Sequence, residues 1–177
     1  MHAVAEDLLA LVERCAPLLL ARDPAVVRRR PAPGKWSPQE ILGHLIDSAG
    51  NNQQKFVRLL TRAAPTSPLA PAATTSTPAA PLAFVGYAQD AWVAAQQYQR
   101  ASWRHLVGLW EALNRHLAHV ITNADPARLA ETITIDGAGP FRLDFVMSDY
   151  VEHCKHHLKV VLPEAGIVSR FANVYGT

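Results

Sequence analysis

The spacing of apolar residues along the chain predicts helices and very little strand. Between residues 3 and 21, apolar side chains recur every three or four positions, which is the repeat of one helix face. They are Val4, Leu8, Leu11, Val12 and Leu19. Pro24 follows this segment, so we expect the first helix to end near Ala21.

A capping signal marks the start of a second helix. Ser37 can cap the helix, Pro38 suits its first position, and Glu40 can return a hydrogen bond to the Ser37 backbone. Because apolar residues continue at helical spacing, we expect this helix to run to about Leu60.

Residues 63–83 are rich in Ala, Pro, Thr and Ser, and their prolines exclude a regular helix. We expect a long surface connection there, and a third helical region from Ala88 to Thr122. One apolar stripe of this third region is expected to pack in the core. It comprises Trp92, Trp103, Leu106, Trp110, Leu113, Leu117 and Ile121.

The last part of the chain completes the predicted fold. Residues 132–139 alternate and can form a short extended piece before a turn, and a final helix is expected from Leu143 to just before Pro163. Residues 164–177 form a C-terminal tail. The chain is therefore predicted to be all-α, a single four-helix-bundle domain over residues 1–177 with a long crossover connection between its second and third helices.

The composition and charge of the chain argue against some classes of binding partner. Lys and Arg total 17 against 15 Asp and Glu, a balance that offers nucleic acid no basic surface. No apolar stretch approaches the roughly 20 residues of a membrane span, and the N-terminus is acidic at Glu6 and Asp7, unlike an export signal. Two distant cysteines do not suggest a disulfide framework. We expect a cytoplasmic protein with no nucleic-acid or membrane partner.

Three histidines lie close together in the last predicted helix. At about 100° per residue, His153 and His157 project to one edge of the apolar face, one turn apart, whereas His156 projects to the polar side. Two histidines four positions apart on one face can chelate a metal ion, although the same pair can also arise by chance at a solvated edge. Cys154 projects to the centre of the apolar face and is expected to pack there.

On the second predicted helix, His44 lies beside the apolar face. Ser48, Asn51, Asn52 and Lys55 continue the same flank, which is unusually polar for a helix that lines a core. A lone histidine in such a place is more often a structural residue than a ligand. It becomes a candidate ligand only if it meets His153 and His157.

Two segments resemble the DinB/YfiT-like superfamily of metal-dependent enzymes. They are GKWSPQEILGHLIDSAGNNQQKFVRLL (residues 34–60) and DYVEHCKHHLKVVLP (residues 149–163). The combination of W-[ST]-x-x-E-x-x-x-H-L with H-x-x-x-H-L, about a hundred residues later, carries the resemblance. Residues 87–99 and 109–121 also look like the middle of that family. The resemblance implies a four-helix bundle in which His44, His153 and His157 hold a divalent metal.

Three histidines leave coordination positions open, which is the pattern of catalytic rather than structural zinc sites. Imidazole suits zinc, nickel, copper and iron, so the ligand type alone does not name the metal. Of these four, zinc or nickel is the ion we expect. Asp47 near His44 is a candidate general base, or a hydrogen-bond partner of a ligand histidine. Glu40 near His44 and Asp149 near His153 are further candidates for hydrogen-bond partners.

The resemblance implies thiol transfer in several branches of the family. The leading hypothesis is therefore a transferase that joins a low-molecular-weight thiol to a small electrophile. The alternatives are a hydrolase that activates water, with Asp47 as its base, and a non-catalytic bundle that the metal stabilises. An exposed helix face leaves a homodimer possible.

Overall fold

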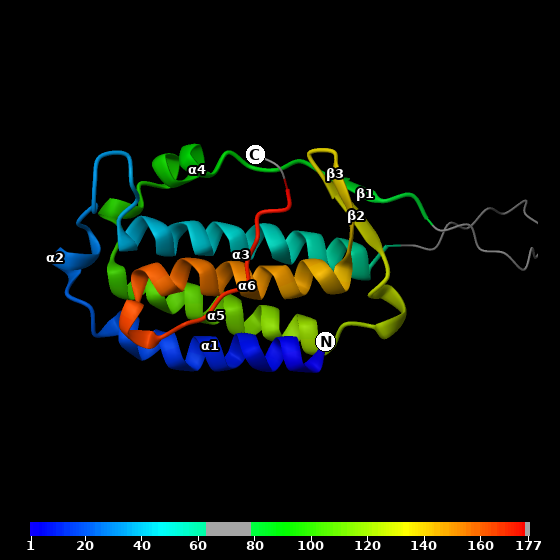
Figure 1. Ribbon diagram of the computed structural model, residues 1–177, viewed down its shortest axis with the longest axis horizontal. Coiled ribbons are helices and arrows are strands. Elements are labelled where there is room, and N and C mark those ends of the chain that lie inside the picture. Colours follow the sequence, from blue (N-terminus) through cyan, green and yellow to red (C-terminus); the bar gives the residue numbers. More distant parts are fainter. Residues whose placement is uncertain (63–78, 176–177) are drawn as a thin grey trace, which may run out of the picture.

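Four long helices lie side by side in the computed structural model, which describes residues 1–62 and 79–175 (Figure 1). They are α1 (His2–Leu20), α3 (Pro38–Leu60), α5 (Trp103–Thr122) and α6 (Leu143–Val161). Helices α1 and α3 each contact both α5 and α6. The four predicted helical segments therefore form the predicted bundle, and no described helix is long and apolar enough to span a membrane.

The start of α3 has the predicted cap. The Ser37 hydroxyl accepts a hydrogen bond from the Glu40 amide at 3.2 Å, and the Glu40 carboxylate accepts one from the Ser37 amide at 2.8 Å. The carboxylate also pairs with Arg30. Burial alone would raise the pKa of Glu40, but the hydrogen bonds from Arg30 and Ser37 outweigh it and hold the pKa at about 2. The cap fixes the residue at which α3 begins.

The third helical region is broken, which corrects the expectation of one helix from Ala88 to Thr122. Helix α4 (Gln89–Gln96) ends at Gln97, whose φ of 49° is left-handed, and the short helix η1 (Tyr98–Arg100) precedes α5. The break turns the Tyr98 ring inward, where it is buried over α3. Trp92 on α4 is 42% exposed, so its predicted place in the core was wrong.

A small sheet corrects the all-α expectation. It consists of β1 (Leu82–Phe84), β2 (Thr132–Ile135) and β3 (Ala138–Arg142), with β1 parallel to β2 and β2 antiparallel to β3. Asp136 and Gly137 both have positive φ, as a two-residue hairpin turn requires. The extended piece expected at 132–139 is therefore one strand and the turn of a hairpin. Its pairing with β1 was not predictable locally, because the two strands are about 50 residues apart.

The connection between α3 and α5 returns along the bundle. Both helices run in the same direction in Figure 1, and the described part of the connection passes from β1 through α4 to the opposite end. Most of the connection expected at 63–83 lies outside the described residues. Three short helices complete the connections: α2 (Pro24–Val27), η2 (Pro126–Arg128) and η3 (Pro163–Ala165).

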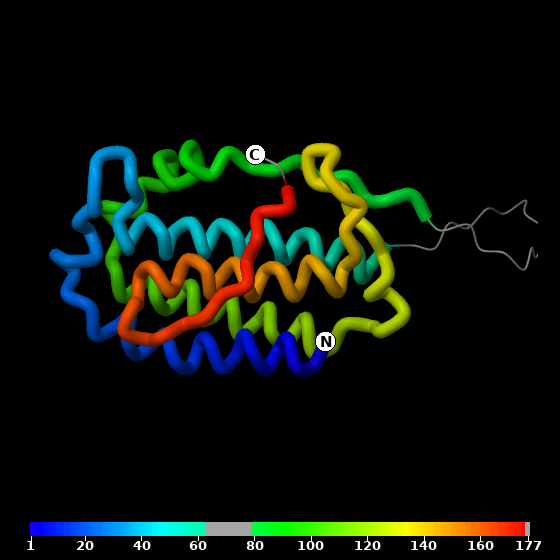
Figure 2. Tube along the Cα trace, in the orientation of Figure 1, coloured from blue at the N-terminus to red at the C-terminus, as the bar shows by residue number. Residues whose placement is uncertain are grey.

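The C-terminal tail is held against the bundle. After η3 the extended chain crosses α6 and reaches toward the sheet, as the red trace in Figure 2 shows. The Ser169 hydroxyl donates to the Glu152 carbonyl at 2.9 Å, and the Arg170 amide donates to the Glu152 carboxylate at 2.5 Å. Further along, the Tyr175 hydroxyl donates to the Asp149 carboxylate at 2.6 Å. The tail thus binds α6 at two successive turns.

Candidate metal centre

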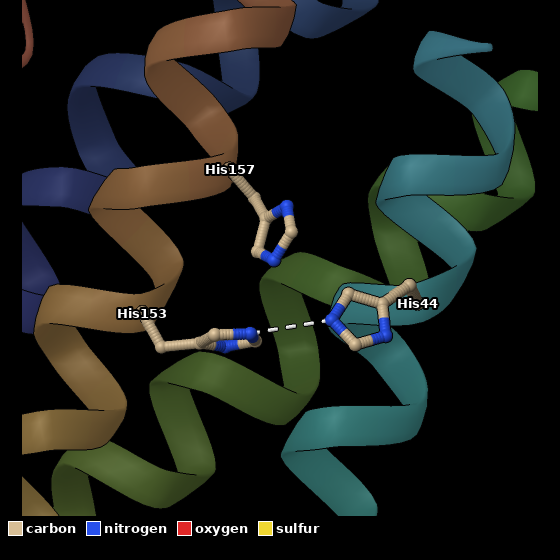
Figure 3. A group of neighbouring side chains, drawn as sticks. All are labelled: His44, His153 and His157. Atoms are coloured by element: carbon tan, nitrogen blue, oxygen red, sulfur yellow. Dashed lines mark hydrogen bonds between the residues drawn. The ribbon is translucent and has the colours of Figure 1, made fainter. Parts of the chain in front are cut away.

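Three imidazole rings meet between α3 and α6. His44 projects from α3, His153 and His157 project from successive turns of α6, and the rings point toward one another (Figure 3). The two Nε2 atoms of His44 and His153 are 3.2 Å apart, and one ligand atom from each of the three residues lies within 4.8 Å of the others. The structure therefore brings together the three residues that the sequence singled out.

The helices explain this convergence. Residues four positions apart on a helix lie above one another on one face, so His153 and His157 share a direction. Helices α3 and α6 are in direct contact, and His44 lies on the buried face of α3. The Trp36 ring, just before the cap, packs against the His44 ring with 5.1 Å between the ring centroids.

Hydroxyl groups lie behind two of the imidazoles. The Tyr87 hydroxyl is 3.4 Å from Nδ1 of His44, and the Ser48 hydroxyl is 3.4 Å from Nδ1 of His153. If each Nδ1–H donates to its hydroxyl oxygen, the Nε2 lone pair of each ring faces the centre of the group. Such a partner on the outer nitrogen is the usual way in which proteins orient imidazole ligands.

Burial keeps all three imidazoles neutral at physiological pH. Desolvation lowers the pKa of His44 to about 4 and that of His157 to about 3. Burial also lowers the pKa of His153 well below its ordinary value, and the neighbouring histidines lower it further. Neutral imidazole is the form that binds metal ions, so the group needs to lose no proton at pH 7 before it can act as a ligand set.

The three histidines form one end of a polar cavity of about 420 Å³. The C-terminal tail provides a wall, because the Phe171 ring lies against His153 and His156 at centroid distances of 5.1 and 5.3 Å. Tyr175 lines the cavity further along, where it binds Asp149. A cavity of this size admits a small molecule rather than a macromolecule.

Other candidate residues lie away from the centre of the group. The structure does not bring Asp47 to the cavity: it is buried, and its Oδ1 accepts hydrogen bonds from Tyr98 at 2.7 Å and Gln96 at 2.5 Å. Glu40 is committed to the cap and to Arg30. Cys154 packs in the core, as expected.

Of the carboxylates considered, Asp149 is the one that reaches the cavity. His156 lies at the cavity edge beside Phe171 and outside the group of three. Its position agrees with the projection that placed it away from His153 and His157.

Sequence reasoning missed Tyr87, Phe171 and Tyr175. These residues lie in extended segments that have no periodicity, so no local pattern indicates where their side chains point. Asn52 belongs to the polar flank that the sequence predicts beside His44. It is half-buried, donates to the Ser48 carbonyl at 2.9 Å and lines the cavity.

The spacing of one pair of imidazoles fits a divalent metal. Two nitrogen ligands that are each about 2.0–2.1 Å from a tetrahedral zinc ion lie roughly 3.3 Å apart, and the His44 and His153 Nε2 atoms are 3.2 Å apart. Within residues 1–62 and 79–175, the group contains no fourth His, Cys, Asp or Glu ligand. A metal held there would therefore keep positions open toward the cavity.

Comparison with known proteins agrees with this architecture. The family model described as DinB superfamily matches residues 1–161. One similar solved structure is described as "YfiT from Bacillus subtilis is a probable metal-dependent hydrolase with an unusual four-helix bundle topology". It is 15% identical, with a TM-score of 0.73 over 94% of this chain and 87% of that chain. No curated protein sequence matches the chain.

Proposed function

The chain belongs to the DinB superfamily, and we propose that it is an enzyme that holds a divalent metal ion, zinc or nickel, through His44, His153 and His157. The observation that carries the proposal is the convergence of three neutral imidazoles at the wall of a small-molecule cavity. When bound there, a divalent ion would supply Lewis-acid chemistry, lowering the pKa of a water or thiol that reaches it.

The reaction that this arrangement favours is transfer of a low-molecular-weight thiol to a small electrophile. A thiolate is itself the nucleophile, so this reaction does not depend on a carboxylate base beside the ligands. The one carboxylate among the described residues that line the cavity is Asp149, and Tyr175 already donates to it. The protein would hold the thiol, exclude bulk water with the tail, and leave room for the electrophile in the cavity.

Hydrolysis is the second candidate. YfiT, which shares the fold, is described as a probable metal-dependent hydrolase. Asp149 replaces Asp47 as the residue that could accept a proton from water, because it lines the cavity and burial raises its pKa. A hydrolase of this kind should lose its turnover in an Asp149→Asn variant even at saturating substrate, whereas thiol transfer, which needs no base at that position, should keep its turnover at saturating substrate.

Metal analysis of the untagged protein and three variants tests the proposal. We expect about one zinc or nickel ion per chain, by elemental mass spectrometry, in the wild type and in His156→Ala. His44→Ala and His157→Ala should lose most of it. His156→Ala is a matched control because it removes a neighbouring imidazole from the same helix but leaves the group of three intact. Absence of metal from the wild type, even after incubation with zinc or nickel, would refute the proposal.

Activity assays then separate the reactions. Thiol transfer requires that an electrophile such as a haloalkane or an activated alkene be consumed only when a thiol is present. Hydrolysis of ester or amide substrates would proceed without a thiol. A metal that only stabilises the bundle would exchange slowly and would not bind added thiols. In a cobalt-substituted protein, the visible spectrum would then stay the same when thiols are added.

A further inference from the structure

The cavity has a second polar end, away from the histidines, where opposite charges face one another. Helices α3 and α6 run in opposite directions, so residues that follow His44 on α3 lie beside residues that precede His153 on α6 (Figure 1). Lys55 lines the cavity from α3, and Asp149 lines it from α6. Both side chains are half-buried, and both lie within the same walls as the three imidazoles.

Neighbouring groups of the protein offset only part of the cost of burying the Lys55 ammonium charge. Within the part of the chain that the structure describes, it makes no hydrogen bond and no direct ion pair. Desolvation lowers the pKa of Lys55, and the more distant charges of Asp149 and Asp136 offset part of that effect. Asp136 is exposed and accepts a hydrogen bond from the Gly86 amide at 2.9 Å, so it is already engaged. A buried donor of this kind gains most from an anionic group of a ligand.

Asp149 presents a matching acceptor. Its Oδ2 accepts the hydrogen bond from Tyr175 at 2.6 Å, and a carboxylate has a second oxygen and further lone pairs with which it can accept from a ligand. An anion alone would meet the Asp149 carboxylate at close range and be repelled. A ligand group that carries both charges avoids this, because its cation can face Asp149 while its anion faces Lys55.

We propose that Lys55 and Asp149 form a binding site for an α-amino-acid group, with Lys55 holding its carboxylate and Asp149 its ammonium. The site selects the substrate or co-substrate of the enzyme proposed above and therefore rests on that function. The substrate carries a free amino-acid end in this site, while its reactive group lies at the histidines.

The spacing sets the length of such a molecule. Asp149 precedes His153 by one turn, which is about 6 Å along α6. Lys55 follows His44 by three turns, about 16 Å, but a helical side chain leans toward the N-terminus and shortens the gap to roughly 10 Å. A thiol separated from an amino-acid group by six or seven bonds spans this distance.

Three related probes test the site by titration calorimetry, with and without metal. γ-Glutamylcysteine carries the complete amino-acid end, glutarylcysteine lacks its ammonium, and 4-aminobutanoylcysteine lacks its carboxylate. We expect the wild type to bind the complete probe about tenfold or more tightly than either truncated one, because each charge has a partly buried partner. Equal affinities for the three probes, tighter binding of a truncated one, or no binding of the complete probe, would overturn the proposal.

Variants assign each charge to its residue. Lys55→Met should weaken binding of the complete probe about tenfold and leave 4-aminobutanoylcysteine unchanged. Asp149→Asn should weaken the complete probe and leave glutarylcysteine unchanged. Lys159→Met removes an exposed lysine of α6 outside the cavity and should change nothing. Lys55→Gln provides a second, polar replacement in case Lys55→Met does not fold.

The two proposals fail in different ways. If the protein holds no metal, the proposed function is wrong, but the dependence of metal-free binding on Lys55 is still measurable. If metal is bound and Lys55→Met binds all three probes as the wild type does, the amino-acid site is wrong while the metal centre remains.

Discussion

Acid should destabilise the metal-free protein because His44 is neutral where it is buried. The side chain is 1% exposed, and desolvation lowers its pKa from 6.5 to about 4. Below pH 6.5 the unfolded chain takes up a proton at this residue and the folded chain does not, so stability falls as the pH falls. The loss begins near pH 6.5 and is complete below about pH 4.

The size of the loss follows from the same two pKa values. Linkage gives about 2 kcal/mol between pH 7 and pH 5, and about 3 kcal/mol once the pH is below the folded pKa. A loss of about 2 kcal/mol is a large part of the 5–15 kcal/mol that is typical of such domains. His153 and His157 shift in the same direction and add to the effect.

Urea unfolding at pH 7 and pH 5, in the presence of a chelator, measures the effect. His44→Gln should lose about 2 kcal/mol less than the wild type between the two pH values, since the glutamine does not titrate. His105→Gln replaces an exposed histidine of α5 and should behave as the wild type does. If His44→Gln shows the same loss as the wild type, burial of a neutral His44 is not what makes the protein acid-sensitive.

Four further substitutions probe the framework around the site. Tyr87→Phe removes the hydroxyl behind the α3 histidine and should weaken metal binding about tenfold in competition with a chelator, with little change in unfolding. Gly43→Ala should destabilise the protein by about 1–3 kcal/mol in urea, because the new Cβ would lie 2.1 Å from the Tyr98 ring. Gly50→Ala, on the same helix but with nothing within 4 Å, should instead stabilise it by about 0.5–1 kcal/mol. Ser37→Ala should cost about 1 kcal/mol through loss of the cap, and an unchanged midpoint would contradict that role.

The three-histidine group was accessible to sequence reasoning because it lies on regular helices. Helix α6 is continuous and one-sided, so a 100° projection placed His153 and His157 together and His156 apart. The Ser37 cap marked the start of α3, and the spacing of its apolar residues placed His44 beside the core face. Only the meeting of the two helices was beyond local pattern, and the family resemblance supplied it.

The other residues that line the cavity could not be predicted from helical spacing. The break at Gln97 lies in a run of good helix formers, and it depends on Tyr98 packing over Gly43 from a distant part of the chain. Phe171 and Tyr175 lie in an extended tail whose path is set by contacts with α6. Positions that depend on tertiary contacts leave no periodic trace in the sequence.

The cavity draws its described lining from α3, α6, the start of α4 with the segment before it, and the tail, and none of it from α1 or α5. Along its length, the bundle therefore has one side that lines the cavity, which includes α3 and α6, and another side, α1 and α5, that supports it. Helices α1 and α5 act on the chemistry only through α3 and α6, chiefly where Asn114 of α5 accepts a hydrogen bond at 2.6 Å from Tyr150, which lines the cavity. Elsewhere those two helices can change during evolution as long as their apolar faces persist. A protein engineer could rebuild those parts for heat tolerance or fuse a second module to them while leaving the chemistry undisturbed.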